Sequence, residues 1–230
     1  MNKISKIVGA VCIYSVSMIG SSFADSSAFT GGYVAVTGSA IGMALDGTRT
    51  KTVDTETNTK GKAGMVSAAA GVEVGFSYPI SDMAFITIGG SFQPFDASVN
   101  AKNVTSGKNV KMDTDDILSV FIEPSFNITE NSAFFLKVGH SDSDVSVSGT
   151  DVENIKSYSF DGTTVALGTK TISDNGMFFK TEAGITDYGT INITGVSEEA
   201  DDTTGEKTYG SSVKADIEVA YGQVTVGYKF

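Results

Sequence analysis

The sequence lacks tryptophan altogether and has only three prolines and one cysteine among its 230 residues. The cysteine is Cys12, which lies in the N-terminal region discussed below, so the rest of the chain has no thiol for a disulfide or for cysteine chemistry. Basic residues are also scarce: 16 Lys and Arg stand against 27 Asp and Glu, and the net charge of −11 argues against binding to nucleic acid. The sequence also contains no glycine-rich phosphate loop and no zinc-binding motif.

Long hydrophobic runs are absent beyond residue 24. A transmembrane helix needs about 20 consecutive apolar residues, and no later segment approaches that length. If the mature chain crosses a membrane, it must therefore do so as a closed β-barrel, the other structure that satisfies every backbone hydrogen bond in lipid.

Residues 1–24 have the features of a secretory signal peptide. Lys3 and Lys6 give a positive start, an apolar run extends from Ile7 to Ile19, and Ser22-Phe23-Ala24 supplies small residues at a cleavage site before Asp25. The alternative of an uncleaved anchor is disfavoured because the run is short. A lipid anchor is disfavoured because Cys12 lies inside the apolar run. We predict a signal peptide over 1–24 and one exported domain over 25–230.

The strongest structural signal is an alternation of period two from Gly64 to Tyr78. One face is apolar, and it consists of Val66, Ala68, Ala70, Val72, Val74, Phe76 and Tyr78. The other face is small or polar, and it includes Ser67, Gly71, Glu73, Gly75 and Ser77. The same alternation recurs over 118–128 and 223–230, and segments of about ten such residues are typical of transmembrane barrel strands.

A hairpin unit repeats three times, at 80–86, 128–135 and 172–179. Each copy has an Ile-Ser/Thr-acid turn that enters an aromatic strand, and Asp, Asn, Ser and Gly at the bend are turn residues. A first strand near Tyr33–Ala44 and a last strand that ends at Phe230 bring the total to eight. Four polar stretches, 45–63, 99–113, 149–161 and 195–212, are expected as long loops. The pattern predicts an all-β fold, a closed antiparallel up-and-down transmembrane β-barrel of eight strands with short periplasmic turns.

Two strands leave open questions. In the first strand, either Val34 and Val36 or Ile41 and Met43 could face lipid. In the last strand, Ile217, Val219 and Tyr221 have the opposite parity to the apolar residues that follow, which predicts a β-bulge near Tyr221–Gln223.

The chain resembles the eight-stranded outer-membrane barrels of the OmpA transmembrane-domain, OmpX and opacity-protein type. The repeated aromatic hairpins and the terminal Val224-Thr225-Val226-Gly227-Tyr228-Lys229-Phe230 carry the resemblance over residues 30–230. The resemblance implies that Val224, Val226, Tyr228 and Phe230 form the signal for the barrel-assembly machinery. Tryptophan, common in the interfacial girdles of membrane proteins, is missing here, and tyrosines and phenylalanines would replace it.

Charged residues on the inward parity are the candidate site. Glu73, Glu123 and Lys137 are expected in the lumen, as are Lys170, Lys180 and Glu182, while Lys229 lies inside or at the wet rim. An eight-stranded barrel has room only for side chains, so we predict a Glu/Lys network that plugs the lumen. The alternative is a polar path for a small solute.

We expect no catalytic residue, no cofactor and no metal site. His140-Ser141-Asp142 suggests a hydrolase, but adjacent strand residues face opposite ways, so His140 is interpreted as a rim residue. The acidic stretches near 142–161 and 198–206 are interpreted as solvated loops, with binding of divalent cations as the alternative.

The predicted function is that of a non-enzymatic, monomeric outer-membrane barrel with a structural or surface-interaction role. Its partners would be outer-membrane lipid, lipopolysaccharide, the assembly machinery and an extracellular ligand bound by the loops, with no nucleic acid. Two alternatives remain: a narrow pore for small or apolar solutes, and a lipid A-modifying enzyme.

Overall fold

The computed structural model describes residues 26–51, 57–94, 97–102, 109–149, 156–194, 198–200, 207–209 and 211–230. The expected signal peptide, with Cys12, lies outside these residues. In the part of the chain that is described, no helix is both long and apolar enough to cross a membrane.

Eight of the described strands form a closed antiparallel ring. They are β1 (Gly31–Lys51), β2 (Thr57–Ser81), β3 (Ala84–Gln93), β5 (Asn109–Thr129), β6 (Ser132–Gly149), β7 (Lys156–Ile172), β8 (Met177–Thr194) and β11 (Ser211–Lys229). Their order is β3-β2-β1-β11-β8-β7-β6-β5, and pairing of β3 with β5 closes the ring. The predicted eight-stranded up-and-down barrel is confirmed. β4 (Ala97–Lys102) pairs with β5 beyond the end of β3, while β9 (Glu198–Ala200) and β10 (Lys207–Tyr209) form a separate hairpin.

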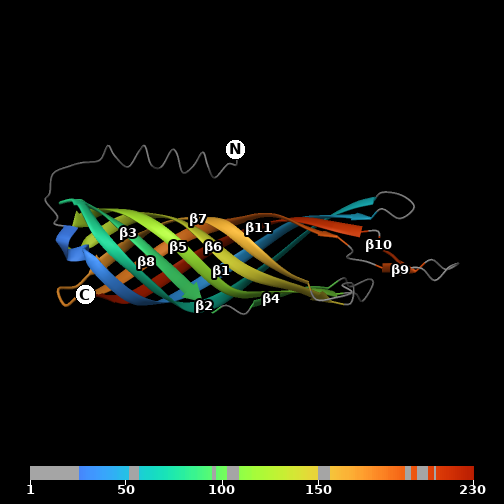
Figure 1. Cartoon of the computed structure of the whole chain (residues 1–230), viewed down its shortest axis with the longest axis horizontal. Helices are drawn as coiled ribbons and strands as arrows, with labels where there is room; N and C mark the ends of the chain where they lie inside the picture. The colour runs from blue at the N-terminus through green and yellow to red at the C-terminus, as the bar shows by residue number, and fades with distance from the viewer. Residues whose placement is uncertain are drawn as a thin grey trace.

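The two ends of the barrel differ in their connections (Figure 1). One end, called the turn end below, holds the three short turns at 82–83, 130–131 and 173–176, the 3-10 helix η2 (Ser26–Phe29) and the C-terminus. The other end, the loop end, holds β4, β9 and β10. The three short turns fall where the repeated hairpin unit predicts them.

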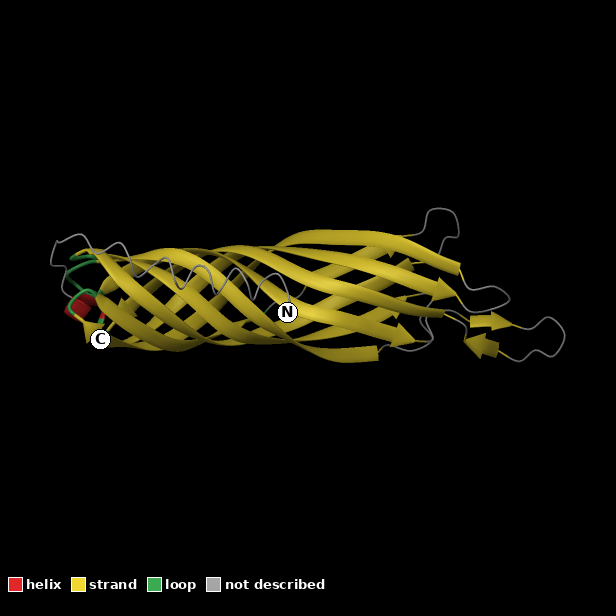
Figure 2. Ribbon diagram, turned by 90° about the horizontal axis from the view of Figure 1, so that it is seen from above, coloured by secondary structure: helices red, strands yellow, loops and turns green. Residues whose placement is uncertain are grey.

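Three of the four polar stretches expected as loops, 45–63, 99–113 and 149–161, belong in part to the strands, so the expected loop bounds were wrong there. β1 and β2 stay paired up to Lys51 and Thr57, and β5 and β7 begin at Asn109 and Lys156. β7 is 17 residues long and β2 is 25 residues long, whereas about ten residues are enough for a strand to span an outer membrane. The wall is consequently a long cylinder, as Figure 2 shows.

Near the turn end the wall is apolar outside and polar inside. On β2, the outward side chains of Val72, Val74, Phe76 and Tyr78 are exposed, while Glu73 and Ser77 between them are buried. In β1, Val34 and Val36 point outward and Ile41 and Met43 are buried, which settles the orientation of the first strand. The alternation predicted for Gly64–Tyr78 is confirmed.

Toward the loop end the same wall reverses its polarity. The outward positions there are charged on several strands and include Asp46, Asp116, Asp142, Asp144, Asp161, Asp216 and Glu218. Many inward positions there are apolar, with Ile41, Met43, Phe160, Ile217 and Val219 buried, while β6 places Ser141 and Ser143 inward. β1 and β11 therefore keep one parity along their whole ladder, while the surroundings of their two faces change along its length.

This reversal corrects the bulge predicted in the last strand. The ladder between β1 and β11 runs without a shift from Tyr33–Lys229 to Lys51–Ser211. Ile217 and Val219 point inward together with Gln223 and Thr225, so no change of parity occurs near Tyr221–Gln223. The irregularity between β11 and β8 lies instead at Ile217/Glu218, opposite the extra residue Tyr188 on β8.

Five aromatic rings inside the barrel each lie directly across from a glycine on the neighbouring strand. The pairs are Tyr33–Gly75, Phe121–Gly89, Phe135–Gly168, Phe178–Gly227 and Tyr221–Gly184. At Gly75 an added Cβ would lie 2.7 Å from the Tyr33 ring, and the other four glycines are equally crowded by their partner rings. The glycines thus provide the space that the rings occupy in a narrow interior.

We predict that Gly75→Ala destabilises the barrel by about 1–3 kcal/mol, because the new methyl group overlaps the Tyr33 ring. The matched control is Gly38→Ala on β1, where an added Cβ meets no atom within 4 Å and the effect stays within about 0.5 kcal/mol. Urea unfolding of the refolded barrels measures both, and equal midpoints would contradict the crowding.

Candidate functional site

Five charged side chains meet in the middle of the lumen. Lys180 Nζ lies 2.6 Å from Glu73 Oε1, 3.0 Å from Glu123 Oε1 and 3.4 Å from Glu182 Oε2. Lys137 Nζ lies 2.7 Å from Glu182 Oε2, 3.3 Å from Glu123 Oε1 and 3.5 Å from Glu73 Oε2. We call these five residues the charge network. They come from β2, β5, β6 and β8 and so cross the lumen from wall to wall.

The charge network is shielded from solvent. Glu73 and Lys180 are 1% exposed, and Glu123 is 2% exposed. Removing such charges from water costs several kcal/mol for each ion unless partners and hydrogen bonds replace the solvent. Here each ammonium contacts all three carboxylates, so no member of the network stands alone.

The position of each charge follows from the local strand pattern. Glu73 lies between the outward Val72 and Val74, and Lys137 lies between Leu136 and Val138. Because successive side chains point to opposite faces, apolar neighbours on the outer wall turn the charged residue inward.

Two tyrosines complete the network, and sequence reasoning missed both. Tyr33 donates its hydroxyl hydrogen to Glu73 Oε1 at 2.9 Å, and Tyr221 donates to Glu182 Oε1 at 3.1 Å. The glycines opposite these tyrosines were the available signal, because a glycine inside a strand marks close approach by another group.

Aromatic rings surround the two ammonium groups. Lys137 Nζ lies 4.3 Å from the centre of the Phe121 ring, and Lys180 Nζ lies 5.3 Å from the centre of the Phe135 ring. A cation over a ring face is attracted by the ring quadrupole, the more so when water is excluded. The rings thereby add to the stabilisation of the ammonium groups by the carboxylates.

Lys170 is buried between the charge network and the turn end, and its environment differs from that of the network. Its Nζ lies 4.6 Å from the centre of the Tyr33 ring and 4.5 Å from that of Phe178. Among the described residues, no carboxylate lies within ion-pair distance of it. Lys170 thus lies beside the predicted network and outside its ion pairs. Lys229 is half-buried at the turn end.

A cavity of about 50 Å³ lies above the charge network, toward the loop end. Lys137 and Glu182 border it, and a chain of hydroxyl groups runs along its wall from Ser119 through Ser141 and Thr164 to Thr186, with distances of 2.8, 3.0 and 2.8 Å. About three or four water molecules fit such a volume. The lumen therefore narrows from a small chamber with a mixed polar and apolar lining to a layer filled by charged side chains.

The His140-Ser141-Asp142 segment does not assemble a nucleophilic site. His140 Nε2 lies 3.8 Å from Asp142 Oδ1 on the outer face, whereas Ser141 points inward and is hydrogen-bonded to Ser119 and Thr164. A nucleophile and its base must lie within hydrogen-bond reach, and the wall separates these two. Within the described ranges, no group of three or more acidic or histidine side chains is placed to hold a metal ion.

The four residues of the expected assembly signal share the outer wall. Val224, Val226 and Tyr228 are half-exposed on β11, and Phe230, which follows the strand, is 73% exposed. The Phe230 N–H donates to the carbonyl of Gly32 at 2.9 Å, which joins the chain end to β1.

We predict that Glu123→Ala lowers the free energy of unfolding by about 3–5 kcal/mol, because it leaves two buried ammonium groups short of a carboxylate. Asp142→Ala is the matched control: its side chain is more than half exposed, and the loss stays below about 1 kcal/mol. Urea unfolding in the same detergent measures both variants, and similar midpoints would rule out a stabilising role for the network.

Comparison with known proteins places the fold. No family model matches the sequence, and no curated protein matches it. Among solved structures, OprG from Pseudomonas aeruginosa superposes with a TM-score of 0.55 at 13% identity, over 87% of this chain and 96% of that one. The Ail protein of Yersinia pestis, in complex with the heparin analogue sucrose octasulfate, gives 0.42 at 14% identity, over 87% and 100% of the two chains.

The likeness to OprG agrees with the closed antiparallel ring described above. Both the strand order and the superposition lead to one fold. The chain has the fold of the small eight-stranded outer-membrane β-barrels.

Proposed function

We propose that this protein is an outer-membrane barrel with a structural or surface-interaction role, whose lumen is plugged by the charge network. The observation that carries the proposal is the set of ion pairs between 2.6 and 3.5 Å that joins four strands across the lumen. Side chains packed in this way leave no continuous aqueous path in a barrel of this size.

The outer wall supports placement in the outer membrane. Its exposed aliphatic and aromatic side chains include Val66, Val74, Phe76, Ile88, Leu118, Val120, Ile122, Phe126, Leu167, Phe179, Val226 and Tyr228. A monomeric soluble protein seldom exposes so large an apolar surface. Lipid and lipopolysaccharide are the partners that would cover it, and a cleaved signal peptide over 1–24 would route the chain there.

The loop end supports a surface role. The strands run past the apolar part of the wall, and their outward side chains there are charged, as at Asp46, Asp161 and Asp216. A rigid cylinder that projects into water presents its connections to the outside, where binding functions commonly lie. An extracellular ligand would therefore meet the loop end of this monomeric barrel.

The cavity favours one second candidate, a narrow pore for small solutes. The chamber bordered by Lys137 and Glu182 has a row of hydroxyl groups along one wall and would form the loop-end half of such a path. For the lipid A-modifying enzyme, by contrast, the placement of Ser141 behind the wall removes the sequence feature that suggested it. Of the two, only the pore keeps a supporting observation.

The C-terminal residues support a role in assembly. Val224, Val226, Tyr228 and Phe230 lie in one outward row at the turn end. In this place they are available to the barrel-assembly machinery while the last strand joins the first.

We predict that the purified wild-type barrel gives no unitary current steps in planar lipid bilayers, because the charge network fills the lumen. The protein is inserted by detergent dilution, with a porin of known conductance as the positive control. Liposome swelling with small neutral solutes provides a second measurement. Reproducible current steps or liposome swelling with the wild-type protein would contradict the plugged lumen and support the narrow pore.

For the assembly row, we expect Phe230→Ala to lower the yield of folded barrel in outer-membrane fractions several-fold, while refolding in detergent is nearly unchanged. The control is Phe126→Ala, an outward phenylalanine on β5 outside the C-terminal row. Heat-modifiable migration in electrophoresis reports folded protein in both settings. An unaltered membrane yield for Phe230→Ala would refute the assembly role.

A further inference from the structure

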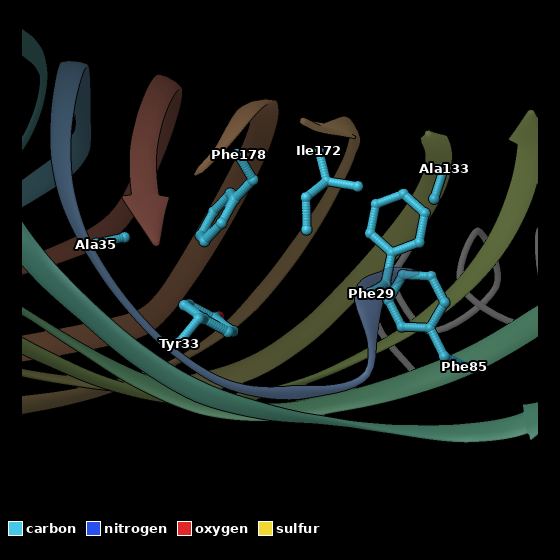
Figure 3. Close-up of a cluster of buried hydrophobic side chains, with 7 residues drawn as sticks. All are labelled: Phe29, Tyr33, Ala35, Phe85, Ala133, Ile172 and Phe178. Atoms are coloured by element: carbon cyan, nitrogen blue, oxygen red, sulfur yellow. The ribbon is translucent and has the colours of Figure 1, made fainter. Parts of the chain in front are cut away.

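A second layer of buried side chains, this one apolar, lies between the charge network and the turn end. We call this set the turn-end cluster, and it consists of Phe29, Tyr33, Ala35, Phe85, Ala133, Ile172 and Phe178 (Figure 3). All except Phe29 belong to strands of the barrel wall. Phe29 is the last residue of η2, so the chain outside the wall supplies part of the seal.

Phe29 fills the mouth of the barrel. Its side chain is 1% exposed, and its ring stacks on that of Phe85 with centroids 4.9 Å apart and planes 9° apart. In Figure 3 the Phe29 ring lies between Phe85 and Ala133, on the far side of the cluster from Ala35. Apolar burial and ring stacking hold it there, so this closure uses no charged group of the network.

Ser26 joins η2 to the turn between β2 and β3 by two hydrogen bonds. The Ser26 N–H donates to the carbonyl of Asp82 at 2.7 Å, and the Ser26 hydroxyl donates to the carbonyl of Ser81 at 2.7 Å. The ladder of β1 begins only after η2, with Gly31 opposite Ser77. The helix can therefore leave the mouth without breaking a single strand-to-strand hydrogen bond.

Gly31 connects η2 to the wall in a conformation that suits a hinge. Its φ is +124°, which side chains disfavour, and an added Cβ would lie 2.7 Å from the Phe230 carbonyl oxygen. Thr30 and Gly31 are thus the junction between η2 and the wall, whose ladder begins with the Gly31–Ser77 pair.

We propose that η2 is a hinged stopper: Phe29 seals the turn end of the lumen independently of the charge network, and η2 swings out as a unit about Thr30 and Gly31. This goes beyond the proposed function, because closure at this end needs none of the five charged residues. Motion of η2 is a local opening, and the strands stay paired while it occurs.

Access of a small thiol reagent tests the stopper. In a Cys12→Ser background the chain has no thiol, so Ser125→Cys, an inward residue paired with Phe85, becomes a lone reporter below the network. The folded barrel is exposed to a small methanethiosulfonate in detergent. We expect slow labelling with Phe29 in place, at least tenfold faster labelling in Phe29→Ala, and a several-fold increase in Ser26→Ala, which removes one anchor.

A matched reporter separates the stopper from general loosening. Ser141→Cys borders the cavity on the other side of the network, and its labelling should be unchanged by Phe29→Ala and by Ser26→Ala. Equal rates at Ser125→Cys with and without Phe29, or a parallel rise at both reporters, would overturn the seal. No increase in Ser26→Ala would overturn the swing. The labelling experiment measures access of a reagent to Ser125→Cys, whereas the plug model is tested by conductance. A conducting wild-type barrel would therefore contradict the plug model and leave the test of the stopper unaffected.

Discussion

Lys137 and Lys180 each contact three glutamates inside a lumen that water hardly reaches, and this requirement for mutual neutralisation shapes the rest of the interior. Charges in a medium of low polarity are stable only when every one has partners in good geometry. Tyr33 and Tyr221 each add one hydrogen bond to a glutamate, and their rings need space that Gly75 and Gly184 provide. The glycines are therefore part of the electrostatic arrangement, although they carry no charge.

The strands combine two kinds of barrel in one wall. Near the turns, β2 presents valines and aromatics outward and Glu73 inward, as a membrane barrel does. Toward the loops, β11 presents Asp216 and Glu218 outward and buries Ile217 and Val219, as a water-soluble barrel does. Each half turns outward the side chains that suit its surroundings, which are lipid near the turns and water toward the loops. The reversal therefore follows from this change of surroundings along one continuous ladder.

The sequence allowed the barrel, the strand number, the three turns and the inward parity of Glu73 to be predicted, because a period of two over ten or more residues is typical of a strand with two unlike faces and of little else. It misled at Ile217 and Val219, where an apolar inward face was interpreted as a bulge on the assumption that lipid surrounds the whole strand. Phe29 and the tyrosines of the interior were missed because their roles depend on residues far away in the chain, such as Phe85 and Glu182. Local patterns carry no information on such contacts.

The reversal of polarity also fixes the depth of the barrel in a bilayer. Sinking by one pair of residues would draw Asp46 and Asp142 toward hydrocarbon, and rising would lift the uppermost apolar side chains of the wall, such as Val66 and Leu118, out of the lipid into water. A bilayer thicker than the apolar part of the wall cannot be matched by sliding or by tilting a wall so rigidly paired. The lipids must compress around it instead, so this barrel would favour thin membranes and gather short acyl chains at its rim.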